Sequence, residues 1–174
     1  MKIKLVKKKE CTVLTWPAKL LVLTISFLIL YLLFTQMSTY LSKNKPQNGD
    51  YLVLDGEMPD YSIEKAIKIY YEFGYKTIIT TGGKLPAGHY ISGKTTMAEL
   101  TYATFLELGF DTTKIVVIPG GNVVKDRTYT SGLSLKKWFF EHNITSAKVD
   151  VLAIGSHARR SQNLFQKALG DNFE

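Results

Sequence analysis

The feature that most constrains this chain is an uncharged apolar run near its N-terminus, LLVLTISFLILYLLF over residues 20–34. Weakly polar residues continue the run to Leu41, and about 20 residues at ~1.5 Å each span a hydrocarbon core of ~30 Å. Trp16 precedes the run and Tyr40 follows it, at positions where amphipathic rings settle at membrane interfaces. We therefore expect residues 19–41 to form a transmembrane helix that lies in the lipid bilayer.

Two other interpretations of this segment stay open. A cleaved signal peptide has a shorter apolar region, roughly 7–15 residues, followed by small residues at the cleavage site. Here the run is longer and ends in Gln36-Met37-Ser38-Thr39-Tyr40, which lacks a good small-x-small pattern. The other alternative is a core helix of a soluble protein. The length and the flanking residues favour an uncleaved anchor.

Basic charge is concentrated around the apolar run. Residues 1–45 hold eight of the 22 basic residues and one of the 15 acidic residues. Residues 46–174 therefore contain 14 basic and 14 acidic residues, and their formal net charge is zero. The net charge of +7 therefore belongs to the N-terminal segment and gives no basic surface for nucleic acid. Six lysines precede the run and two follow it. The positive-inside rule then places residues 1–18 in the cytoplasm and the rest of the chain outside.

The remainder of the chain has the pattern of one α/β domain. Residues 42–49 are polar with Pro and Gly, as in a linker, so the domain would cover residues 50–174. Short apolar runs then alternate four times with segments of helical periodicity. The expected strands are 51–54, 77–81, 115–118 and 149–154, and the expected helices are 62–73, 96–109, 128–142 and 158–169. Thr96 and Glu99 fit a capping box. This order predicts a Rossmann-like three-layer α/β sandwich with a mainly parallel sheet.

Ligands of open α/β sheets bind beyond the carboxyl ends of the strands. The residues directly after the four expected strands are Asp55-Gly56-Glu57, Gly82-Gly83-Lys84, Gly120-Gly121-Asn122 and Gly155-Ser156-His157. We expect these four sets to lie along one edge of the sheet. Their glycines allow a ligand to approach the backbone, but plain βα turns use glycine equally often. The long segment 84–94 is either a lid over this edge or a disordered surface loop.

The segment 155–161, GSHARRS, is the most suggestive cluster. It lies at a strand-to-helix junction, where free N–H groups and the helix dipole point toward the expected edge. Arg159 and Arg160 fall in the first helical turn, where the dipole already disfavours positive charge. Such a placement suggests an anionic partner. The partner is either an external phosphate or carboxylate, or an internal acid such as Asp55, Asp126 or Glu99; a solvated pair is the third alternative.

Other chemistries have little support in the sequence. Ser156 and His157 do not form the G-x-S-x-G elbow, and adjacent residues at a helix start seldom face each other. Asp55, Glu57, Asp126 and His157 lack the spacing of a metal-ligand set, and no Walker A or G-x-G-x-x-G pattern occurs. We therefore predict no metal site, and the sequence assigns neither a reaction nor a cofactor.

Several blocks occur in a characteristic order from Tyr51 onward. They are Asp55-Gly56, IEKAIKIYYEFG at 63–74, IITTGG at 78–83, Met97–Glu99 before Leu108-Gly109, Arg127–Ser131, and Ser156–Arg160 before Phe165 and Ala168–Gly170. In this order they resemble the YdcF/SanA/ElyC-like family, a bacterial envelope-associated domain of unknown function. The resemblance implies a Rossmann-like sheet, frequent N-terminal membrane anchoring and a role in envelope maintenance. Mapped onto this chain, it points to Asp55, Gly83, Glu99, Thr128, His157 and Arg160 as cleft residues.

This chain departs from the family pattern at two places. Residues 127–131 stand where many members carry an Asn-Thr…Asn segment. Members usually continue past the last helix into another strand, whereas this chain ends with residues 171–174. We therefore expect either a trimmed fold or a truncated sequence.

Together these observations predict a membrane-anchored, extracytoplasmic domain with a role in bacterial cell-envelope biogenesis or maintenance. We expect it to bind an anionic small molecule or a lipid-carrier phosphate at the strand-end edge. The alternative is a non-catalytic envelope scaffold or interaction protein without a small-molecule ligand, in which the arginines hold internal acids. The expected ligand-binding residues are Asp55, Gly56, Gly82, Gly83, Glu99, Thr128, Ser156, His157, Arg159 and Arg160.

Overall fold

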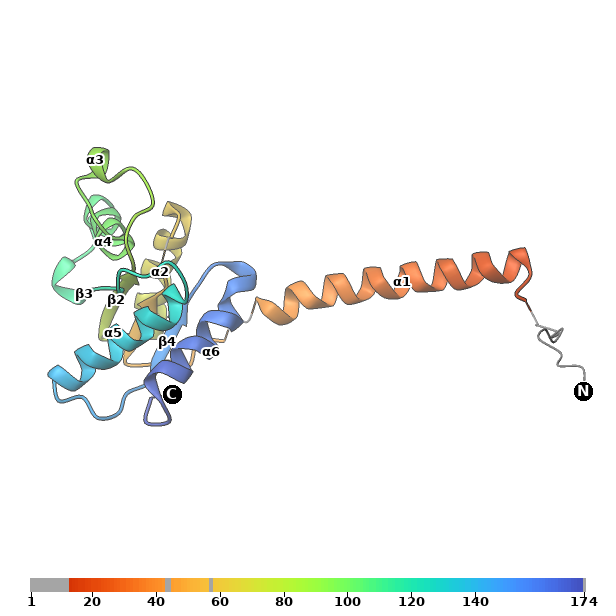
Figure 1. Ribbon diagram of the computed structural model, residues 1–174. Helices are drawn as coiled ribbons and strands as arrows, with labels where there is room; N and C mark the ends of the chain where they lie inside the picture. The colour runs from red at the N-terminus through yellow and green to blue at the C-terminus, as the bar shows by residue number, and fades with distance from the viewer. Residues whose placement is uncertain (1–12, 43–44, 57, 174) are drawn as a thin grey trace, which may run out of the picture. The chain divides into compact units, whose positions relative to one another are not determined.

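The computed structural model describes residues 13–42, 45–56 and 58–173 (Figure 1). The expected basic segment 1–18 and linker 42–49 lie only partly within these ranges, and Glu57 lies outside them. The chain divides into two units, residues 1–38 and 39–174, and each is described by itself.

The first unit consists mainly of α1, which runs from Trp16 to Leu41. Its 26 residues reach ~39 Å at ~1.5 Å per residue, more than the ~30 Å of a hydrocarbon core. None of its residues is buried. The hydroxyls of Thr24 and Thr35 donate to carbonyls of Leu20 and Leu32, each at 2.9 Å, so the helix satisfies these polar groups itself. The described residues thus include one helix that is long and apolar enough to cross a membrane.

The second unit is built on a four-stranded, all-parallel sheet with the strand order β3-β2-β1-β4. The strands are β1 (Tyr51–Leu54), β2 (Thr77–Gly82), β3 (Ile115–Pro119) and β4 (Val149–Leu152). In this register Val53 of β1 lies beside Ile79 of β2 and Val151 of β4. The predicted α/β fold with a Rossmann-like parallel sheet is confirmed, and each expected strand is found, although β4 ends at Leu152 and not at Ile154.

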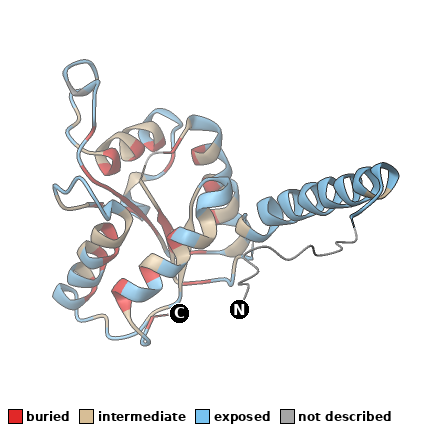
Figure 2. Ribbon diagram, turned by 45° about the vertical axis from the view of Figure 1, so that its right-hand side comes forward, coloured by how far each residue is buried: buried red, intermediate tan, exposed pale blue. Residues whose placement is uncertain are grey.

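Helices cover both faces of the sheet, which gives the expected three layers (Figure 2). On one face, α2 (Asp60–Phe73) and α4 (Met97–Glu107) pack with the side chains of Leu52 and Leu54. On the other, α5 (Arg127–Glu141) and α6 (Ala158–Leu169) pack with Val53. Successive residues of a strand point to opposite faces, so one apolar run supplies both cores.

The helix ends explain where the chain turns back toward the sheet. The predicted capping box is confirmed, since Thr96 Oγ1 accepts from Glu99 N at 3.2 Å and Glu99 Oε2 accepts from Thr96 N at 3.1 Å. Gly74 ends α2 in the left-handed conformation, with φ 69°. The segment 84–94 contains a short helix, α3 (His89–Ser92), and Lys84 forms an antiparallel bridge with Thr96.

Candidate functional site

A cavity of about 560 Å³ lies where the carboxyl ends of three strands meet the first turns of two helices. Its volume is within the range of small-molecule sites, roughly 300–1,000 Å³. The residues that follow β1, end β2 and follow β4 form one side, and the starts of α5 and α6 form the other. The lining residues are Asp55, Gly56, Gly82, Gly83, Lys84, Met97, Val124, Lys125, Asp126, Arg127, Thr128, Ser131, Ala153, Ile154, His157, Arg160 and Ser161.

Glycine at the strand ends is required by close packing. Gly82 has φ 136°, and a Cβ added there would lie 2.7 Å from Met97 Cβ. A Cβ on Gly120 would lie 2.8 Å from Ser131 Oγ and 3.1 Å from Gly83 N. The glycines after β3 therefore pack against the end of β2, and they are not among the residues that line the cavity.

Asp55 is the acidic residue that the fold positions most tightly in this cavity. Ser161 Oγ donates to Asp55 Oδ2 at 2.5 Å, and the Thr128 side chain also hydrogen-bonds to this carboxyl. Burial raises the pKa of Asp55 above its ordinary value. The hydrogen bonds from Ser161 and Thr128, and then the charges of His157 and Arg160, oppose this rise. The carboxyl is thus held between α5 and α6 by a hydrogen bond from each helix.

Positive charge outweighs negative charge around the cavity. Four exposed cationic side chains line it, those of Lys84, Lys125, Arg127 and Arg160. They face two carboxylates, Asp55 and Asp126, so the Lys, Arg and Asp residues of the lining give a formal net charge of about +2. Neither α5 nor α6 has an acidic residue in its first turn, and among their N-cap residues only Asp126 of α5 brings a carboxylate to the positive end of a helix dipole.

Asp126 has a backbone conformation that is unusual for a residue with a side chain. It is the N-cap of α5 with φ 56° and ψ 31°, in the left-handed region, and its side chain makes no capping hydrogen bond. Its carbonyl accepts from Thr130 N at 2.9 Å, which begins the helix. Left-handed backbone outside glycine is enriched at functional sites, because the surrounding structure must hold it in place. Here it brings Asp126 and Arg127 to the mouth of the cavity.

The structure brings seven of the ten predicted ligand-binding residues together in the cavity lining. These are Asp55, Gly56, Gly82, Gly83, Thr128, His157 and Arg160. Glu99, Ser156 and Arg159 are not among the lining residues. Ligand binding by any of the ten remains a prediction.

Glu99 and Arg159 have other partners in the fold. Glu99 Oε2 accepts from Thr95 N at 2.8 Å and Thr95 Oγ1 at 2.9 Å, besides its bond from Thr96. These bonds, led by that from the Thr95 backbone, lower the pKa of Glu99. Arg159 Nε donates to the Tyr40 carbonyl at 2.8 Å, and its guanidinium lies 3.7 Å from the centre of the Tyr40 ring. Adjacent arginines therefore have different roles, and Arg160 is the one at the cavity.

Several residues that line the cavity carry no signal in the sequence. Val124 and Lys125 belong to no motif, and only the path of the chain between β3 and α5 brings them to the cavity. Ser161 belongs to the segment 155–161, but no local pattern in the sequence indicates its hydrogen bond to Asp55. Among the described residues no group of three or more His, Cys, Asp or Glu side chains is placed to hold a metal ion.

No protein-family model matches this chain, and no curated protein matches it. The class of protein is therefore defined by fold and site alone. It is an α/β domain with a parallel sheet and a cationic cavity at the strand ends, in a chain with one helix able to cross a membrane.

Proposed function

We propose that this chain is a membrane-anchored protein of the bacterial cell envelope whose α/β domain binds an anionic small molecule or a lipid-carrier phosphate. The observation that carries the proposal is the cavity lining, in which four cationic side chains face two carboxylates. Their charges converge on one concave site, where a ligand bearing phosphate or carboxylate would be desolvated and held by several donors.

Two structural details support an external anion over internal partners for these cations. The described residues contain two ion pairs, Lys76–Asp50 and Lys137–Glu141, and neither includes a cation of the cavity. The starts of α5 and α6 also contribute to the site, through Arg127 and Thr128 of one helix and Arg160 and Ser161 of the other. Helix starts carry backbone N–H groups without intrahelical partners, and these groups favour anions.

The proposed location follows from the N-terminal part of the chain. Six lysines before the apolar run and two after it favour a cytoplasmic N-terminus and an extracytoplasmic domain. The resemblance to YdcF/SanA/ElyC-like proteins supports a role in envelope biogenesis or maintenance. In this orientation a linker of about eight residues would keep the domain within reach of the outer face of the bilayer, where lipid-linked phosphates would be accessible.

The test measures ligand-induced thermal stabilisation of the full chain in detergent micelles, with inorganic phosphate and a short-chain polyprenyl phosphate as probes. We expect the double variant Arg127→Ala, Arg160→Ala to weaken binding at least about a hundredfold, because each of the two charged hydrogen bonds contributes ~1.5–3 kcal/mol, or more than about tenfold. Arg159→Ala is the matched control, since it removes an adjacent arginine that does not line the cavity.

The outcomes separate the alternatives. Stabilisation by the polyprenyl phosphate alone identifies a lipid-carrier ligand, whereas equal stabilisation by both probes identifies a small anion. If stabilisation survives the double variant, the cavity is not the anion site and the proposal fails. If neither probe stabilises the parent and the double variant melts at a markedly lower temperature, the arginines are structural, as in a scaffold.

A further inference from the structure

The contact between Arg159 and Tyr40 joins the start of α6 to a residue that the sequence places at a membrane interface. Arg159 Nε donates to the Tyr40 carbonyl, and the guanidinium lies over the Tyr40 ring. The chain from Thr39 onward belongs to the second unit, so the contact lies within that unit. Arg159 therefore holds Tyr40 at the start of α6.

The same contact satisfies a helix end. α1 ends at Leu41, and the last carbonyls of a helix have no intrahelical partners. The last turn of α1 carries no basic residue, so the guanidinium of Arg159 is the cation that meets these carbonyls and the negative end of the helix dipole. This explains why a cation is placed in the first turn of α6, where the dipole of α6 alone disfavours it.

Tyr40 is held at the edge of the sheet where the anion cavity lies. His157 and Arg160, which flank Arg159 closely in the chain, both line that cavity. Tyr40 follows the apolar run, and tyrosine rings at such positions settle at the level of the lipid headgroups. An interfacial residue fixed at this edge would bring the strand ends, and not the opposite edge, to the bilayer surface.

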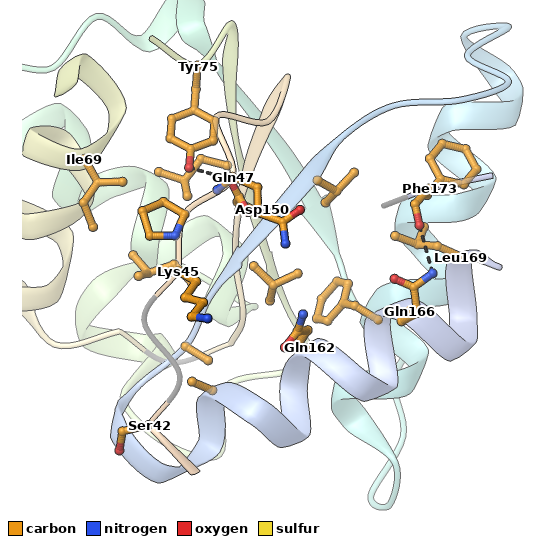
Figure 3. Close-up of a pocket in the computed structure, with 18 of the residues that line it drawn as sticks. Ser42, Lys45, Gln47, Ile69, Tyr75, Asp150, Gln162, Gln166, Leu169 and Phe173 are labelled. Atoms are coloured by element: carbon orange, nitrogen blue, oxygen red, sulfur yellow. Dashed lines mark hydrogen bonds between the residues drawn. The ribbon is translucent and has the colours of Figure 1, made fainter. Parts of the chain in front are cut away.

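The chain that follows α1 is attached to the domain at a second place. Asp150 Oδ2 of β4 accepts from Gln47 N at 2.9 Å and from Gly49 N at 3.3 Å. It also accepts from Tyr75 Oη at 2.6 Å, and Figure 3 shows Asp150 together with Gln47 and Tyr75. A connection held at two places leaves the domain less freedom to rotate about its anchor than a free polar linker would.

The loop between β3 and α5 gives this edge the chemistry of a membrane-binding surface. Val124 is 95% exposed and Val123 is 40% exposed. Lys125 and Arg127, which follow them in the chain, are exposed cations that line the cavity. Apolar side chains beside cations are typical of surfaces that enter the headgroup region of anionic bilayers.

We propose that the strand-end edge, defined by Tyr40, Val124, Lys125 and Arg127, docks on the anionic lipid surface around the chain's own anchor. Arg159 acts as the latch that sets this orientation, and the anion cavity then opens toward the headgroups. The inference rests on the membrane anchoring in the proposed function, and it holds whether or not the cavity binds an anion.

The experiment compares two labelled positions of the full chain in vesicles of an equimolar mixture of phosphatidylglycerol and phosphatidylcholine. The chain carries Cys11→Ser and one new cysteine, either Val124→Cys at the proposed surface or Ser146→Cys, an exposed position before β4 at the opposite edge. Each thiol bears an environment-sensitive fluorophore. Iodide on both sides of the membrane quenches labels in water, and a headgroup nitroxide quenches labels at the interface. We expect iodide to quench position 124 at least about threefold less than position 146, and the nitroxide to quench it more.

Arg159→Ala tests the latch in both labelled chains. It should bring the iodide quenching at the two positions close together, because the edge is no longer held at the interface. Lys68→Ala is the matched control, since it removes one exposed cation of α2 outside the cavity lining and should leave the difference unchanged.

Equal iodide quenching at the two positions of the parent, or stronger shielding at position 146, would overturn the proposal. A difference that survives Arg159→Ala would overturn it as well. Stabilisation by inorganic phosphate is measured on the same variants in micelles, so a wrong orientation and a failure of anion binding are recognised separately. A chain that does not float with the vesicles would contradict both the anchoring and the docking.

Discussion

Ser161 Oγ donates a 2.5 Å hydrogen bond to Asp55 Oδ2, and the two residues are 106 positions apart in the chain. The bond joins the residue that follows β1 to the first turns of α6. Ser161 is buried, so its hydroxyl has little access to water that could replace this partner. The contact thus ties the position of a cavity carboxyl to the packing of a helix against the sheet.

Ser161→Ala is expected to destabilise the domain by about 1–3 kcal/mol, because it leaves a partly buried carboxyl with one fewer donor. The measurement is chemical denaturation of the full chain in detergent. Ser156→Ala, an exposed serine outside the cavity lining, is the control and should change stability by less than ~0.5 kcal/mol. Equal stability of the two variants would show that the bond to Asp55 contributes nothing.

The pH dependence of stability should contain a component from Asp55. Burial raises its pKa above the ordinary value of 3.8, so the native state binds this proton more readily than the unfolded chain. The stabilising contribution is therefore fully present below pH 3.8 and is lost as the pH rises through the native pKa. On acidification from pH 7 to pH 4, the parent should gain stability relative to Asp55→Asn. A constant difference between the two would contradict the raised pKa.

Glu99→Gln is a control for this measurement, because the stability contribution of Glu99 should change with pH in the opposite direction to that of Asp55. Hydrogen bonds, led by that from the Thr95 backbone, lower the pKa of Glu99 below 4.5, so its contribution is present above that pH. This contribution is lost as the pH falls through the native pKa. The parent should therefore lose stability relative to Glu99→Gln on acidification, while glutamine keeps the capping box.

The elements of the fold could be predicted because their signals are local. β-branched runs such as residues 77–81 and the capping box at Thr96 and Glu99 each need only a few neighbouring residues to be recognised. The shared edge was predictable too, since parallel strands end on the same side of a sheet. Contacts between distant segments, such as Asp55 with Ser161, have no such signal.

At the candidate site, local sequence patterns do not decide which of several neighbouring side chains faces the cavity. Adjacent residues on a helix point about 100° apart, so Arg159 and Arg160 could not both face one cavity, and the pattern alone did not choose between them. Glu99 matched two roles at once, a cap and a cleft residue, and the structure shows its capping bonds.

Gly82→Ala should destabilise the domain by roughly 2–5 kcal/mol. A backbone conformation with positive φ lowers the stability by about 1–2 kcal/mol when the residue has a Cβ. Overpacking lowers it by about 1–3 kcal/mol more. Both apply, since Gly82 has φ 136° and its Cβ would lie 2.7 Å from Met97 Cβ. Gly88→Ala separates the two effects, because Gly88 has φ 82° and open space around the added atom. Thermal unfolding should show the smaller loss for Gly88→Ala, and equal losses would argue against the packing at the strand end.

The proposed orientation of the chain can be tested with its single cysteine, Cys11, which precedes the apolar run. With six lysines before that run, we expect Cys11 to remain in the cytoplasm. In spheroplasts, a membrane-impermeant maleimide should label the parent only after permeabilisation. The variant Ser156→Cys, Cys11→Ser moves the thiol to an exposed position of the α/β domain and should react in intact spheroplasts.

The labelling pattern distinguishes the remaining interpretations of the N-terminal segment. Labelling of Cys11 in intact spheroplasts, with protection at position 156, would mean that the domain is cytoplasmic. A cleaved signal peptide would remove Cys11 together with the apolar run, so the mature chain would be shorter by mass and carry no label after permeabilisation. Because the apolar run is longer than that of a signal peptide and lacks a small-x-small site, and because six lysines precede it, we expect the full-length mass and the cytoplasmic Cys11.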